Sequence, residues 1–318
     1  MALKFSENLD DLFLISQEVI SERGEDSYCC ACREASAMVA VCDGCGGLGS
    51  RTYASTSGYT EAYLASRIVS GAIYDWFTEN CDTVWKDTAE LVDQMRQYVE
   101  KAYDIGTSYI ARGSRIRGSM VRDFPTTAAI SVVQQVGKDL YAHVVWAGDS
   151  RVYLMDRNGL AQLTKDDVES DDAMSNLSDD GALTNVVSSD GRFELHYKCI
   201  KLQGPTMVFA ATDGCFGYIP SPMEFEYMLL HAIVNAPTPE EFKYKLKEYF
   251  VEVAGDDFAF ACMCFGFKDF AGMVDTFADR KVFLEQHYVV PIQEDRSEEH
   301  VQQLWQEYRV NYERHYAM

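Results

Sequence analysis

The 318-residue sequence predicts a layered α+β fold, and three observations support this prediction. Short apolar runs lie close together along the chain, as is typical of antiparallel meanders. Other segments repeat apolar residues at helical spacing. These helical segments come in pairs between groups of strands, so the order along the chain is strands, two helices, strands, two helices and strand. A doubly wound parallel sheet would instead alternate single strands with single helices, and it is disfavoured.

Six runs rich in β-branched, aromatic and small apolar residues predict the strands. They are residues 36–42, 128–136, 140–147, 151–155, 207–212 and 258–267. Only Gly-Lys-Asp separates the second and third runs, which is a compact hairpin connection.

Apolar stripes between Ala65 and Trp76 and between Leu91 and Ala102 predict the first helix pair. A second pair follows Asp213. Its second member starts at the capping box Thr238-Pro239-Glu240-Glu241.

The chain changes character after Phe267. We expect one domain over residues 1–267 and a helical C-terminal extension over residues 268–318, which lack strand signals. The extension ends in a predicted amphipathic helix that begins after Ser297. Its stripe is Val301, Leu304, Trp305, Tyr308 and Tyr312. This stripe either packs on the chain's own domain, which is the commoner outcome, or binds another protein.

Composition excludes several classes of partner. The formal net charge is -22 and the pI is near 4.6, so nucleic acid and anionic membranes would be repelled. No apolar run reaches the length of a signal peptide or a membrane span. Most of the ten cysteines fall in apolar segments, as in reduced proteins. We therefore expect a cytoplasmic protein.

Aspartates stand at the ends of the predicted strands. Asp43 follows the first run, Asp213 follows the fifth, and Asp256 precedes the sixth, while Asp26 lies just before a strand-like stretch. These carboxylates meet at one edge if the last strand is antiparallel to the others. Because crowded carboxylates repel one another, such a cluster calls for cations, and oxygen ligands select Mg²⁺ or Mn²⁺.

The order and spacing of several motifs resemble the metal-dependent protein phosphatases, the type 2C family, and in particular its bacterial type. The resemblance spans about residues 20–267. The stronger motifs are Glu25-Asp26-Ser27, Asp43-Gly44-Cys45-Gly46-Gly47, Ala147-Gly148-Asp149-Ser150-Arg151, Ala211-Thr212-Asp213-Gly214 and Gly255-Asp256-Asp257. The weaker ones are Pro125-Thr126-Thr127 and Leu163-Thr164-Lys165-Asp166-Asp167.

The resemblance implies a four-layer α-β-β-α sandwich of two antiparallel sheets flanked by helices. It implies hydrolysis of phosphoserine and phosphothreonine in proteins by a metal-bridged hydroxide, without a phosphoenzyme intermediate. The implied cofactors are two Mg²⁺ or Mn²⁺ ions and a weaker third. The implied setting is signal transduction, with phosphorylated protein substrates and a cognate serine/threonine kinase.

The resemblance also assigns roles to residues. Asp43 would bridge both metals, and the Gly44 carbonyl would bind one of them. Asp213 and Asp256 would hold the other metal. Asp149 matches a position that contributes to the third, weaker site.

Two further assignments are less direct. Asp26 or Glu25 would act on a metal directly or through water. The family often has an arginine where this chain has Ser21, so the displaced Arg23 is the candidate for binding the substrate phosphate.

Two alternatives stay open at this point. Cys45 and Arg51 fit the Cys-x5-Arg signature of cysteine-dependent phosphatases, although that interpretation leaves the aspartates unexplained. Alternatively, the fold is kept for binding or regulation and the chemistry is impaired. Three departures favour this second alternative: Ser21, where the family often has arginine, Cys45, where many members have histidine, and Gly217, where some have a carboxylate. The acidic segment 166–180 is either a solvated loop or a flap that shapes substrate choice.

Overall fold

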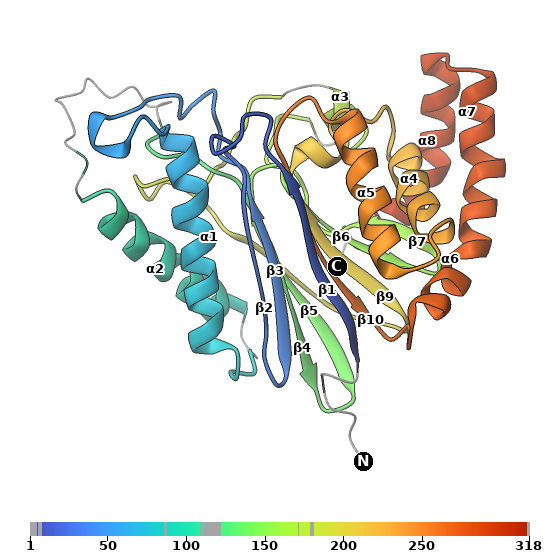
Figure 1. Ribbon diagram of the computed structural model, residues 1–318, viewed down its shortest axis with the longest axis horizontal. Coiled ribbons are helices and arrows are strands. Elements are labelled where there is room, and N and C mark those ends of the chain that lie inside the picture. The colour runs from blue at the N-terminus through green and yellow to red at the C-terminus, as the bar shows by residue number, and fades with distance from the viewer. Residues whose placement is uncertain are drawn as a thin grey trace.

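Two antiparallel five-stranded sheets stack face to face, with helices on both outer faces (Figure 1). This computed structural model describes Phe5, Ile110 and residues 8–85, 88–108, 122–170, 172–178 and 181–316. The arrangement confirms the predicted α-β-β-α sandwich.

The first sheet has the strand order β1-β10-β9-β6-β7. Its strands are β1 (Leu9–Gln17), β10 (Phe258–Phe265), β9 (Thr206–Ala211), β6 (Arg151–Asp156) and β7 (Gly159–Gln162). The second sheet has the order β2-β3-β4-β5-β8. Its strands are β2 (Ser27–Cys32), β3 (Ser36–Cys42), β4 (Ala128–Val136), β5 (Asp139–Ala147) and β8 (His196–Lys201). Strands β1, β2, β7 and β8 were not among the six predicted runs, although β2 corresponds to the strand-like stretch noted after Asp26.

The strand β3 shows how the layers are held together. All seven of its residues are buried. Val39 and Val41 face the core between the two sheets, whereas Met38 and Ala40 face the core under the helices. Because side chains alternate across a strand, an unbroken apolar run can be buried on both faces.

Helices α1 (Glu61–Asn80) and α2 (Thr88–Gly106) cover the outer face of the second sheet (Figure 1). Thr60 caps α1 by accepting a hydrogen bond from the Tyr63 amide. Val69, Ile73 and Trp76 of α1 pack into the core with the sheet, as the helical stripe predicted.

Helices α4 (Pro222–Val234), α5 (Pro239–Val253), α6 (Phe270–Leu284) and α8 (Glu298–Tyr312) lie on the outer side of the first sheet (Figure 1). The Thr238 side chain caps α5 by accepting from the Glu241 amide, so this half of the predicted capping box forms. Ser297 is the N-cap residue of α8, but its side chain makes no capping hydrogen bond.

The C-terminal segment belongs to the same core as the first sheet. After α6, a π-helical turn (Glu285–Val289) and α7 (Val290–Glu294) lead to α8. Trp305, Tyr308 and Tyr312 of α8 are buried in the cluster that contains Tyr153 and Phe209. The stripe predicted for this helix therefore packs on its own chain. Among the described residues, no helix is both long and apolar enough to cross a membrane.

Candidate active site

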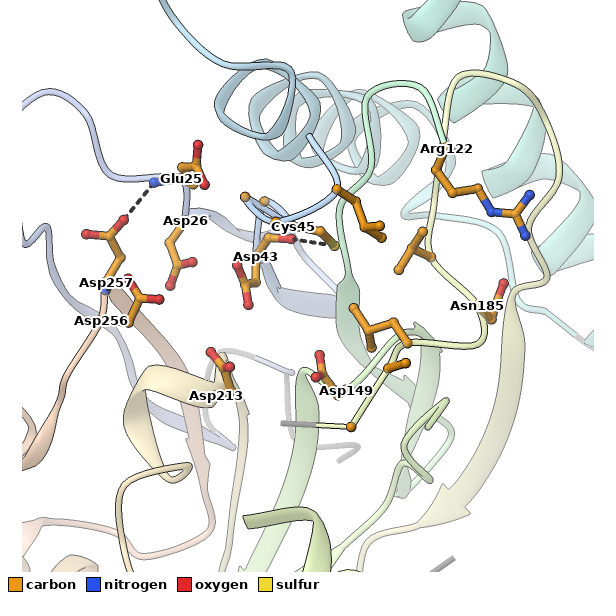
Figure 2. Close-up of a pocket in the computed structure, with 18 of the residues that line it drawn as sticks. Glu25, Asp26, Asp43, Cys45, Arg122, Asp149, Asn185, Asp213, Asp256 and Asp257 are labelled. Carbon is orange, nitrogen blue, oxygen red and sulfur yellow. Dashed lines mark hydrogen bonds between the residues drawn. The ribbon is translucent and has the colours of Figure 1, made fainter. Parts of the chain in front are cut away.

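A pocket of about 620 Å³ opens at one end of the two sheets, and aspartates line it (Figure 2). Its lining includes all the predicted metal ligands, namely Glu25, Asp26, Asp43, Gly44, Asp149, Asp213 and Asp256, together with Asp257. The carboxylates of Asp26, Asp43, Asp149, Asp213 and Asp256 surround a common space, as Figure 2 shows.

The strand ends bring these residues together. Asp43 directly follows β3, Asp213 comes two residues after β9, and Asp256 comes two residues before β10. Strands β9 and β10 pair antiparallel, with Ala211 opposite Phe260. The end of β9 and the start of β10 therefore lie at the same edge of the sheet, as the sequence argument required.

Two threonines fix the backbone of Asp43. The Thr126 hydroxyl and the Thr127 amide donate to the Asp43 carbonyl at 2.7 and 2.8 Å. The Asp43 amide in turn donates to the Thr127 hydroxyl at 3.1 Å. Residues of the weak motif Pro125-Thr126-Thr127 thus fix the position of the Asp43 backbone.

The glycines after Asp43 and Asp213 serve close packing. A Cβ atom at Gly44 would lie 2.5 Å from the Ala62 carbonyl oxygen, and one at Gly214 would lie 2.0 Å from the Asp257 carbonyl oxygen. Neither glycine has a positive φ. Their backbone conformation therefore does not require glycine, and the absence of a side chain instead lets a neighbouring segment approach each aspartate.

Hydrogen bonds from the first sheet's side of the pocket fix the loop that carries Asp26. The Asp257 carboxylate accepts hydrogen bonds from the Val19 amide at 2.6 Å and the Glu25 amide at 2.8 Å. The Thr212 hydroxyl donates to Asp26 at 2.7 Å. Figure 2 shows the Asp26 carboxylate turned toward the acidic cluster and the Glu25 carboxylate turned away from it.

Hydrogen bonds of Asp167 fix the segment that carries Asp149. Asp167 accepts from the Gly148 amide at 2.9 Å, from the Asn185 side chain at 2.7 Å, and contacts the His196 ring at 2.8 Å. Gly148 has φ of +95°, a conformation that glycine adopts without a steric penalty. The segment between β5 and β6 is thereby tied to the pocket wall at Asn185.

The acidic cluster is electrostatically unfavourable by itself. Burial, followed by the negative charges of Asp213 and Asp26, raises the pKa of Asp43 well above its usual range. Burial and the charge of Asp213 also raise the pKa of Asp26 well above its usual range. The same two causes raise the pKa of Asp149 to about 7. Nearby cations would reverse this effect, because they favour the ionised carboxylates.

The donor atoms suit hard divalent cations. They are carboxylate and carbonyl oxygens, which Mg²⁺ and Mn²⁺ prefer. In the described part of the chain, no three His, Cys, Asp or Glu side chains are arranged so that they could hold a metal ion. Mg²⁺ commonly takes one or two carboxylates and completes its shell with waters and substrate oxygens, so the residues fit a partly hydrated ion.

The cysteine-dependent alternative finds no support in the local chemistry. Burial and the charges of Asp43 and Asp149 raise the pKa of Cys45 well above its usual value. A nucleophilic cysteine requires a lowered pKa. Arg51 lies 3.8 Å from Glu61 and is not among the residues that line the pocket.

The described arginine in the pocket lining is Arg122, which sequence reasoning missed. Arg23, the predicted phosphate ligand, lies outside this lining; it donates to the Gly58 carbonyl and lies over the Tyr59 ring. Asp167 and Asp257 belong to two of the motifs, but the sequence assigned no role to either residue. Their hydrogen bonds to backbone amides leave no signal in the sequence.

The acidic segment 166–180 is partly anchored, and its residues 171, 179 and 180 lie outside the described part. Asp166 forms a buried ion pair with Arg151, with a shortest distance of 2.6 Å. Asp172 accepts from Trp305 and Arg309 of α8, each at 3.2 Å. These two acids are therefore bound to the protein and not simply solvated.

The sequence matches the family model of protein phosphatase 2C over residues 20–251, which is more than half of the chain. The chain belongs to the protein phosphatase 2C family. A comparison with curated proteins found no match.

Solved structures of bacterial serine/threonine phosphatases share the protein phosphatase 2C fold with this chain. The catalytic domain of PstP in complex with two manganese ions is 17% identical, with a TM-score of 0.53, over 81% of this chain and 99% of that one. Mycobacterium tuberculosis PstP/Ppp is 16% identical, with a TM-score of 0.56, over 81% and 99%. Staphylococcus aureus Stp1 is 14% identical, with a TM-score of 0.58, over 83% and 96%. These likenesses confirm the predicted fold.

Proposed function

We propose that this protein hydrolyses phosphoserine and phosphothreonine in other proteins as a metal-dependent phosphatase. The observation that carries the proposal is the group of aspartates around one pocket in a member of the protein phosphatase 2C family. Phosphorylated proteins would be its substrates, and a cognate serine/threonine kinase would supply them. Such an enzyme would act in signal transduction.

The proposed cofactors are two Mg²⁺ or Mn²⁺ ions, in keeping with the two manganese ions of the PstP structure. Asp43, Asp213 and Asp256, together with the Gly44 carbonyl, would hold the two ions, and waters and phosphoryl oxygens would complete their shells. Asp26, whose carboxylate faces the cluster, would assist in preference to Glu25. Asp149 would contribute to a weaker third site. The bound ions would supply an activated water that attacks phosphorus directly, so that no phosphoenzyme forms.

The remaining residues position these ligands. Thr126 and Thr127 hold the Asp43 backbone, and the Thr212 hydroxyl orients the Asp26 carboxylate. Asp257 fixes the loop that leads to Asp26 through two backbone amides. Held in this way, the oxygens need little rearrangement when charge develops on the phosphoryl group.

A phosphopeptide assay with Mn²⁺ and with EDTA tests the proposal on the wild type and on Cys45→Ser. We expect both proteins to hydrolyse the peptide with Mn²⁺ and to lose activity in EDTA, because Cys45 is not the nucleophile. Activity that survives EDTA but disappears in Cys45→Ser would establish the cysteine mechanism instead. Mn²⁺ binding without any hydrolysis would indicate an impaired, regulatory relative.

A further inference from the structure

The pocket is polarised from one side to the other. The aspartates lie on one side, and Arg122 lies across from them, as Figure 2 shows. Among the described residues that line the pocket, Arg122 is the one with a cationic side chain. Its guanidinium is on the side of Asn185 and points away from the acidic cluster (Figure 2).

The pocket lining also includes apolar residues. Leu48, Ala182, Leu183 and Val186 belong to the pocket lining. Leu48 is 49% exposed, which is high for a leucine in a protein with a full core. An exposed apolar surface beside a reaction centre suits the side chains of a bound peptide.

The Arg122 side chain is only loosely engaged by its acidic neighbour. It lies 3.9 Å from Asp190 and is 22% exposed. Asp190 is bound more closely by Arg192, whose Nε donates at 2.9 Å, and by the Ser188 hydroxyl at 2.8 Å. A guanidinium carries five N–H donors, so Arg122 retains the capacity to bind a further oxyanion.

The backbone beside Arg122 is held in an unusual conformation. Phe124 has φ of +54°, which is rare for a bulky residue, and it is buried. The Tyr103 hydroxyl donates to the Phe124 carbonyl at 2.9 Å, and the Ser189 amide donates to the Asp123 carbonyl at 2.9 Å. Strain that the surrounding contacts maintain is typical of sites with a function, here the presentation of Arg122 at the pocket.

We propose that Arg122 is a specificity-determining residue that binds an acidic side chain flanking the phosphorylated residue of the substrate. The inference rests on the proposed function and names its substrate class. The phosphate itself belongs at the aspartate side, where cations would receive it, and Arg122 lies on the other side. A net charge of -22 repels acidic groups in general, so an acidic residue of the substrate needs a local cation, and Arg122 is the one in the described pocket lining.

The test uses phosphopeptides in which Glu, Ala or Lys is placed in turn at each position on either side of the phosphoserine. Arg122→Ala should lower kcat/KM for the Glu peptide at one position by roughly three- to fivefold, mainly through KM. The ratio of kcat/KM for that Glu peptide to kcat/KM for the Ala peptides and for para-nitrophenyl phosphate should fall by the same factor. Arg122→Glu should reverse the preference at that position in favour of Lys, which a purely structural role would not do.

Arg33→Ala and Arg33→Glu are the matched controls, because they change the net charge equally at the far end of the β2–β3 hairpin. Equal losses on para-nitrophenyl phosphate and all peptides would overturn the proposal, since Arg122 would then bind the phosphate or support the fold. An unchanged preference in both Arg122 variants would also overturn it. If the wild type hydrolyses no phosphomonoester, the proposed function fails, and the same comparison of peptide affinities by fluorescence anisotropy decides the role of Arg122.

Discussion

One glycine sets the path of the backbone beside Asp149. Gly148 has a positive φ, and a Cβ atom there would lie 2.7 Å from the Thr127 side chain. Thr127 also binds the Asp43 amide. A substitution at Gly148 would therefore disturb two of the proposed ligands through a single contact.

We expect Gly148→Ala to lower both stability and activity. Gly137→Ala is the control, because Gly137 also has a positive φ but a Cβ there meets no atom within 4 Å. Urea unfolding should show a loss in the free energy of unfolding about 1–3 kcal/mol larger for Gly148→Ala, from the steric clash alone. Equal losses in the two variants would show that the conformation matters and the contact with Thr127 does not.

The pair formed by His196 and Asp167 gives a pH-dependent contribution to stability. The hydrogen bond between the His196 ring and the Asp167 carboxylate raises the pKa of His196 above its ordinary value, so the folded protein binds this proton more tightly than the unfolded chain. The contribution is complete below the unfolded pKa of about 6.5 and is lost as the pH rises through the raised folded pKa.

His196→Gln should therefore cost more stability at about pH 6 than at about pH 9, with a difference below about 1 kcal/mol. Urea unfolding of both proteins at each pH measures it. A larger cost at the higher pH would contradict this sign.

At the residue scale, the sequence indicated the aspartates that line the pocket but not the residues that hold them in place. Asp43, Asp213 and Asp256 stand next to strand ends, which leave a clear hydrophobic signal. Asp257 and Asp167 act on backbone amides of distant segments, and such partners depend on the tertiary fold. The pocket arginine, Arg122, stands three residues before the weak motif that begins at Pro125, and no motif places it in the pocket.

At the scale of elements, the helix α8 connects the C-terminal segment to the surroundings of the pocket. Trp305 and Arg309 bind Asp172, and the Tyr312 hydroxyl donates to Gln162 at 3.0 Å. Gln162 also donates to Asp166, the partner of Arg151. The helix is thus joined by side-chain hydrogen bonds to the strand that follows Asp149.

Trp305→Ala should destabilise the whole protein, because Trp305 is fully buried in the core of the first sheet. The expected loss in the free energy of unfolding is about 3–5 kcal/mol. Val310→Ala on the same helix is the control, since Val310 is 75% exposed, and it should change stability by less than about 0.5 kcal/mol. Similar small losses in both variants would show that α8 is not part of the folded core.

The four strands outside the predicted runs, β1, β2, β7 and β8, lie at the edges of their sheets. Charged or exposed residues interrupt the apolar ones in β1 and β8, whereas β7 is buried but has only four residues. Edge strands commonly carry such residues, which weakens their hydrophobic signal. The central strands β3, β4, β9 and β10 are buried on both faces, so their apolar runs predicted them closely.

At the scale of the whole molecule, the charge distribution and the fold serve the same site. The two sheets bring the aspartates to one end, and the net charge of -22 adds a negative field that attracts cations. The family resemblance predicted the four layers, whereas the contacts of the C-terminal helices came only from the structure.

Titration of Mn²⁺ into metal-free protein, with heat and phosphopeptide hydrolysis measured on the same samples, tests the central claim most directly. The proteins to compare are the wild type, Asp43→Asn, Asp213→Asn and the control Asp139→Asn, whose side chain pairs with Lys201 on the surface. We expect the wild type and the control to bind Mn²⁺ and gain activity together, and the two pocket variants to lose both, with activity lower by at least about a hundredfold. Full turnover in Asp43→Asn or Asp213→Asn would contradict the account.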